Sequence, residues 1–166
     1  MTRDPRHTAL DILCRVENGA YADRLLDAWR NNANPADDRL LQHLVLGTLT
    51  YQARLDFILT PYLKKPNQKQ RPKLRNLLRL GVYQLQHLDR VPAYAIVSES
   101  VTLARKTLGA PVARMVNTIL RGIAENRKPI TFPDPNNDPN RHINHRLGDH
   151  SHNNGWHSCD CPKRRV

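Results

Sequence analysis

Apolar side chains recur every three or four residues along most of the first 126 positions, and this spacing favours helices. The clearest case is the segment 72–88, PKLRNLLRLGVYQLQHL. At 100° per residue, its apolar positions share one face: Leu74, Leu77, Leu78, Gly81, Leu85 and Leu88. No segment alternates apolar and polar residues with β-branched enrichment, so no sheet is expected. The pattern predicts an all-α fold.

Prolines and cap residues divide this pattern into separate helices. Asp4-Pro5 and Asn34-Pro35 each offer a side-chain cap followed by a residue suited to the first helical turn. The expected helices cover 5–18, a shorter stretch around 25–29, 35–61 with a break or bend near Thr50, 72–88, 93–108 and 111–123. About six or seven helices joined by short links predict a compact bundle.

Gly81 occupies a core position in the helix expected over 72–88. An interior glycine costs roughly 1 kcal/mol relative to alanine, so a plausible reason for it is the close approach of a neighbouring helix. Gly47 and Gly122 either serve the same purpose in their helices or are incidental, tolerated residues.

The amino-acid composition of the chain changes after residue 128. Residues 129–166 hold five Pro, six Asn and five His with few large apolar residues, so they cannot form a core. We therefore expect a helical domain at 1–128 and an extended or disordered tail at 129–166, the remnant of a linker. The odd composition after about His142 suggests a truncated or frame-shifted end. Three cysteines without a disulfide framework and the lack of a signal peptide or spanning segment predict a cytoplasmic protein.

The net charge of +11 is concentrated in one segment. Residues 61–90 hold eight Lys or Arg and one acidic residue, whereas residues 1–60 are nearly neutral. A basic block of this kind suits a polyanion, because each neutralised phosphate releases condensed counterions. Nucleic acid is favoured over a membrane, since no amphipathic anchor accompanies the block. The alternative is a solvated face that binds nothing.

The helical wheel places Arg75, Arg79, Tyr83 and Gln86 opposite the leucine row, beside the basic loop KKPNQKQRP. Positive charge and an aromatic ring on one face favour RNA, since Lys and Arg bind phosphate while a ring stacks on an unpaired base. The predicted RNA-binding residues are Lys64, Lys65, Lys69, Arg71, Lys73, Arg75 and Arg79, with Arg3 and Arg6 as second candidates.

Other chemistries fit the sequence less well. The tail contains zinc-ligand residue types, but Cys159 and Cys161 lack the usual spacing and a second cysteine pair, so no specific metal site is expected. Neither a GxGxxG loop after a strand nor a GxxxxGK[ST] loop is present. Cys14, without an identifiable base, is more typical of an inert thiol than of a nucleophile.

Four segments in order resemble one family: PRHTALDILCRVENGAYADRLLD, DDRLLQHLVLGTLTYQARLDFIL, LRLGVYQLQHLDRVPAYAIVSESVTLARK and VNTILRGI. Over residues 5–124 the chain resembles a NusB-like domain, more closely the amino-terminal domain of the RsmB (Sun/Fmu) ribosomal RNA cytosine-5 methyltransferases. The resemblance, to a family of 16S ribosomal RNA methyltransferases, implies an all-α RNA-binding fold. In full-length relatives a Pro-rich connection leads to an S-adenosylmethionine-binding domain with a catalytic Pro-Cys motif, which CDCP at 159–162 does not match.

We therefore expect a non-catalytic RNA-binding module, without a cofactor in this chain, that in the parent enzyme helps to position ribosomal RNA. Three alternatives stay open. One is a transcription antitermination factor that binds RNA with a protein partner. Another is a protein-docking bundle without a nucleic-acid role, and the third is a metal-binding tail protein.

Overall fold

The computed structural model describes residues 4–30, 34–65 and 69–126, and these residues form helices without any strand. The tail predicted at 129–166, with its histidines and cysteines, lies outside the described residues. The helices are α1 (Pro5–Glu17), α2 (Ala22–Arg30), α3 (Pro35–Thr50), α4 (Gln52–Leu59), the short 3₁₀ helix η1 (Thr60–Tyr62), α5 (Pro72–His87), α6 (Ala93–Leu108) and α7 (Ala110–Glu125). The prediction of an all-α bundle of six or seven helices is confirmed.

The helix boundaries follow the cap signals in the sequence. The Asp4 carboxylate accepts a hydrogen bond from the Arg6 backbone N–H at 2.9 Å, and the Asn34 side chain accepts one from the Ala36 N–H at 3.2 Å. These bonds satisfy backbone donors that the first helical turn leaves unpaired. Gly109, with φ of +94°, separates α6 from α7, because few other residues adopt that conformation without strain.

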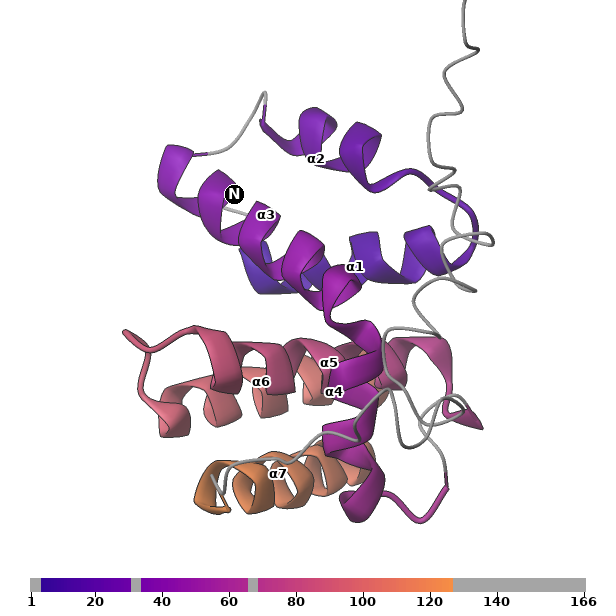
Figure 1. Cartoon of the computed structure of the whole chain (residues 1–166), viewed down its shortest axis with the longest axis vertical. Helices are drawn as coiled ribbons and strands as arrows, with labels where there is room; N and C mark the ends of the chain where they lie inside the picture. Colours follow the sequence, from indigo (N-terminus) through magenta and orange to yellow (C-terminus); the bar gives the residue numbers. More distant parts are fainter. Residues whose placement is uncertain (1–3, 31–33, 66–68, 127–166) are drawn as a thin grey trace, which may run out of the picture.

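Helix α5 is the centre of the molecule. It contacts α1, α3 and α4 on one side and α6 and α7 on the other. Figure 1 shows α1, α2 and α3 in the upper half and α5, α6 and α7 in the lower half, with α4 running down from the end of α3 beside α5. Every residue from Asn76 to Leu85 is buried. Of the polar face expected on this helix, Arg79 and Tyr83 are buried because helices pack on both sides of α5, Arg75 is half-buried and Gln86 is exposed.

Two glycines permit the closest helix contacts: Gly81, as predicted, and Gly47, for which close packing is the one of the two alternatives that is observed. A Cβ at Gly81 would lie 2.8 Å from a Leu120 methyl of α7, and a Cβ at Gly47 would lie 2.0 Å from the Tyr83 ring. A side chain at either position would overlap its neighbour. At Gly122 the corresponding distance, to the Tyr62 ring, is 3.0 Å. None of the described helices is both long enough and apolar enough to cross a bilayer.

Candidate nucleic-acid interface

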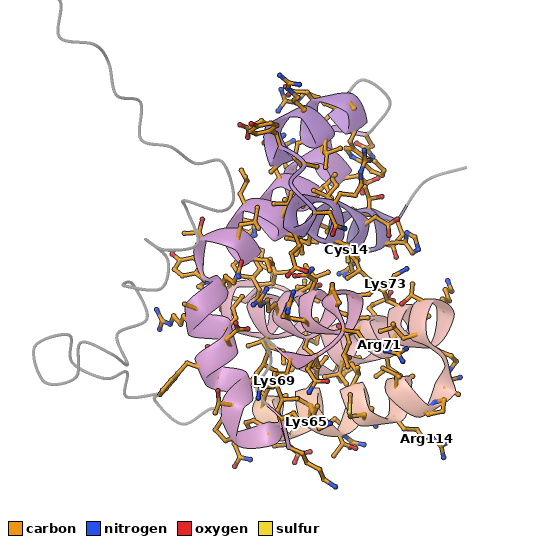
Figure 2. All side chains as sticks on the ribbon, turned by 90° about the vertical axis from the view of Figure 1, so that its right-hand side faces the viewer. Cys14, Lys65, Lys69, Arg71, Lys73 and Arg114 are labelled. Atoms are coloured by element: carbon orange, nitrogen blue, oxygen red, sulfur yellow. The ribbon has the colours of Figure 1, made fainter. Side chains whose placement is uncertain are left out.

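Five of the predicted basic residues lie at the surface around the start of α5, and we call them the basic surface. Four are exposed and the last is half-buried: Lys64, Lys65, Lys69, Arg71 and Lys73. Figure 2 shows Lys73, Arg71, Lys69 and Lys65 following one another along a single face, below Cys14 of α1. The described residues of the connection between η1 and α5 therefore display clustered positive charge that none of the described helices covers.

The predicted RNA contact at Arg79 does not fit the structure, because this side chain is only 3% exposed. Its guanidinium donates two hydrogen bonds to the Asp56 carboxylate of α4, at 2.8 and 2.6 Å, and one to Glu17 of α1 at 3.2 Å. The helical wheel placed Arg79 correctly opposite the leucine row. It could not show that α1 and α4 bring carboxylates to that side, so the charge is neutralised inside the fold.

Arg75 is also engaged inside this network. Its guanidinium forms a two-bond ion pair with Glu17, at 3.1 and 2.9 Å, and its side chain is 18% exposed. Glu17 thus receives hydrogen bonds from both arginines, and the three side chains join α1 to α5. Paired charges of this kind hold helices in register and have few donors left for phosphate.

Of the two second candidates, Arg3 and Arg6, the structure describes only Arg6. Arg6 of α1 is half-buried, and its Nε donates to the Gln84 side-chain oxygen of α5 at 2.9 Å. Gln84 in turn donates to the Leu80 carbonyl at 3.2 Å. Arg6 thus links α1 to the central helix. Arg3 lies outside the described residues, so its predicted role stays a prediction.

Cys14 has the environment of a structural thiol. The Asn76 amide donates a hydrogen bond to its sulfur at 3.8 Å. Burial raises the pKa of Cys14 above its ordinary value, and the bond from Asn76 opposes that shift. A raised pKa keeps the sulfur protonated at neutral pH, which is the opposite of what a nucleophile needs.

Arg114 lies on the same face as the basic surface, although the set of residues predicted from the sequence does not include it. It is exposed on α7, and Figure 2 shows it on the face that carries Lys65 and Arg71. The helical wheel of α7 places Arg114 on the polar side. Only the packing of α7 beside α5, which has no signal in the sequence, brings it to this face.

A groove of about 620 Å³ lies between α1, α2 and α6. Its apolar lining includes Leu25, Leu103 and Trp29, and the buried indole N–H of Trp29 has no hydrogen-bond partner among the described residues. Three carboxylates also line the groove: Asp4, Asp11 and Glu99. Arg15 and Lys106 line the groove as well, so its charges nearly balance, and it suits a protein surface better than a polyanion such as RNA.

Groups of three or more His, Cys, Asp or Glu side chains able to hold a metal ion are absent from the described part of the chain. The residues that prompted the metal hypothesis, His142 to Cys161, lie outside it. The prediction that the tail holds no specific metal site therefore stays a prediction.

The sequence profile of the NusB family matches residues 3–125. This match covers most of the chain and all seven α-helices. The chain belongs to the NusB family. The predicted resemblance is confirmed, and the curated relatives include both proteins named methyltransferase and proteins named NusB.

Two curated relatives illustrate the branches of the family. The "Probable ribosomal RNA small subunit methyltransferase B" of Bacillus subtilis (strain 168) is 36% identical over 141 residues, covering 83% of this chain and 31% of its own length. The "Transcription antitermination protein NusB" of Macrococcus caseolyticus (strain JCSC5402) is 32% identical over 126 residues, covering 75% of this chain and 96% of its own. The chain thus spans less than a third of the first relative and nearly all of the second.

Solved structures have the same fold. NusB of T. maritima superposes with a TM-score of 0.66 at 19% identity, covering 78% of this chain and 96% of that chain. A chain from the "Crystal Structure of Antitermination Factors NusB and NusE in complex with dsRNA" gives a TM-score of 0.66 at 24% identity, covering 74% of this chain and 94% of that chain. The described helices therefore form a NusB fold.

Proposed function

We propose that this chain is an RNA-binding module of the NusB family that binds ribosomal RNA through the basic surface. The single observation that carries the proposal is the row of Lys65, Lys69, Arg71 and Lys73 on one face that no described helix covers (Figure 2). Lysine and arginine side chains at such a site neutralise backbone phosphates and release counterions. A chain in the solved complex of NusB and NusE with double-stranded RNA has the same fold as this protein, and that complex supports the choice of RNA.

The methyltransferase names of several relatives suggest the setting in which the module acts. We propose that residues 1–128 correspond to the part of those longer proteins that positions ribosomal RNA, with 129–166 as a linker remnant. The described residues contain no strand and no strand-to-helix glycine loop of the kind that holds S-adenosylmethionine. We infer that this module binds RNA without itself transferring a methyl group, and that S-adenosylmethionine is bound by another part of the longer relatives.

The test compares binding of a ribosomal RNA hairpin with binding of duplex DNA of equal length across a salt series. The test variant replaces Lys65, Lys69 and Arg71 by glutamine, and leaves the buried network of Arg75 and Arg79 intact. If these residues bind phosphate, the RNA affinity falls, and the slope of log K against log salt shrinks by about two to three units.

A matched variant removes the same amount of charge elsewhere. Arg24, Arg39 and Arg121 are exposed on α2, α3 and α7, and replacing them by glutamine also lowers the net charge by three. Wild-type affinity in this control supports a local RNA surface. Equal losses of RNA affinity in both variants would mean that only the overall charge matters. Wild-type affinity in the test variant would rule out the basic surface as the RNA-binding site.

The groove between α1, α2 and α6 favours a second candidate function, the docking of a protein partner. Its apolar lining suits a segment that presents apolar side chains. Thr102→Arg would place a charge in the groove, whereas Thr118→Arg would place one on the exposed side of α7. Partner binding that resists salt and is lost only in Thr102→Arg would support docking. Binding that survives Thr102→Arg would refute it.

A further inference from the structure

Four aromatic rings meet where α3, α4 and α5 come together, on residues His43, Tyr51, Tyr83 and His87. The Tyr51 ring stacks on that of His87, with centroids 4.9 Å apart and planes at 21°. The Tyr83 ring lies 4.7 Å from that of His87 and 5.5 Å from that of His43. The rings therefore form one cluster, which we call the ring cluster, rather than isolated contacts.

The inner end of the ring cluster is fixed by packing. Tyr83 is only 3% exposed, and its ring occupies the space that a side chain at position 47 would need. Its hydroxyl lies 3.4 Å from the ring nitrogens of His43. Tyr83 was the aromatic residue that the sequence suggested for base stacking. Its burial rules out that role and makes it the support for rings nearer the surface.

The outer end of the ring cluster is Tyr51. This residue links α3 to α4, and its backbone N–H donates to the Gly47 carbonyl at 3.0 Å. Tyr51 is 37% exposed, as is Leu46, and His43 on α3 is exposed as well. Tyr51 therefore offers a positioned aromatic ring at the surface, held against His87.

The charges around the ring cluster favour an anionic partner over a cationic one. Arg54 is exposed on α4, and its charge is near enough to contribute to the lowered pKa of His87, which burial chiefly causes. Asp89 acts in the opposite direction but contributes least. Asp56, the other charged carboxylate of this region, is buried against Arg79. A surface aromatic ring beside a guanidinium is the combination that single-stranded RNA uses.

We propose that Tyr51 stacks on an unpaired base of the bound RNA, with Arg54 beside the adjoining phosphate. This inference rests on the proposed RNA binding and adds a site for an unpaired nucleotide to the phosphate contacts of the basic surface. The ring of Tyr51 and its support on His87 supply the stacking, so the phenolic hydroxyl is not required.

The experiment measures affinity for a single-stranded ribosomal RNA segment and for a fully paired duplex of the same length. Tyr51→Ala is expected to weaken single-strand binding by about 5- to 100-fold, with little change in duplex binding or in salt slope. Tyr51→Phe keeps the ring and should retain wild-type affinity. Tyr94→Ala serves as the matched control, since Tyr94 is a 79% exposed tyrosine on α6.

A second measurement uses only the wild-type protein, so its result does not depend on whether Tyr51→Ala folds. A 2-aminopurine placed at successive positions of the single strand should lose fluorescence at one position when wild-type protein binds. Unchanged single-strand affinity in Tyr51→Ala, or no quenching at any position, would overturn the stacking site. Absence of RNA binding by the wild type would instead overturn the proposed function itself, so the two failures are distinguishable.

Discussion

Replacing Arg79 by methionine tests whether this residue serves the fold rather than RNA. Its guanidinium makes three charged hydrogen bonds, two to Asp56 and one to Glu17, and it is 3% exposed. Methionine fills a similar volume but takes away the positive charge beside two buried or half-buried carboxylates. Breaking a buried ion pair from one side costs about 3–5 kcal/mol. Small domains are stable by about 5–15 kcal/mol, so the variant should lose a large share of its stability.

Urea unfolding followed by circular dichroism measures this loss. Arg71→Met is the matched control, because Arg71 is exposed just before α5, and its cost should stay within about 0.5 kcal/mol. The double variant Arg79→Met, Asp56→Leu should recover part of the loss, since most of the penalty is the carboxylate left without the guanidinium. A cost below about 1 kcal/mol for Arg79→Met would refute the structural role argued from the buried network.

Three further perturbations test other parts of the fold by the same unfolding measurement. Gly47→Ala should cost about 1–3 kcal/mol, since the new Cβ would lie 2.0 Å from the Tyr83 ring, and Gly122→Ala, where the distance is 3.0 Å, should cost less. Burial lowers the pKa of His87 below 6.5, so the unfolded chain takes up a proton at His87 at a higher pH than the folded chain does. The folded state therefore keeps its full stability with respect to this residue above pH 6.5 and loses stability as the pH falls below 6.5. His87→Gln should therefore reduce the acid sensitivity of unfolding, and an unchanged pH profile would contradict this. Asp4→Ala should cost about 1 kcal/mol through loss of the cap on α1, whereas Asp27→Ala, exposed on α2, should cost much less.

The sequence was sufficient for the helices because their signals are local. The Asp4-Pro5 and Asn34-Pro35 pairs begin α1 and α3, and Gly109 separates α6 from α7. The spacing of apolar residues predicted which face of each helix is buried, because residues three or four positions apart lie on the same side of a helix. Only small shifts occurred, such as the start of α7 at Ala110 instead of Pro111.

The composition of the site was harder to predict, because it depends on contacts between distant segments. Glu17 and Arg79 are 62 positions apart, and nothing near either residue shows that they meet. The wheel assigned Arg79 and Tyr83 to a polar face, which is correct for an isolated helix at a surface. In a central helix that face is covered as well, so charged residues on it are paired and aromatic residues on it are packed.

The position of α5 also limits how strongly RNA binding should respond to salt. Of the seven basic residues predicted from 61–90, Arg75 and Arg79 are held by Glu17 and Asp56, which leaves the five of the basic surface. Five phosphate contacts correspond to a slope of log K against log salt of about −3.5 to −4.5. A steeper slope would require further cations on the same face, and Arg114 is the first to test, by replacement with glutamine. A slope of about −1 or weaker would mean that the uncovered charge is solvated and contributes little to binding.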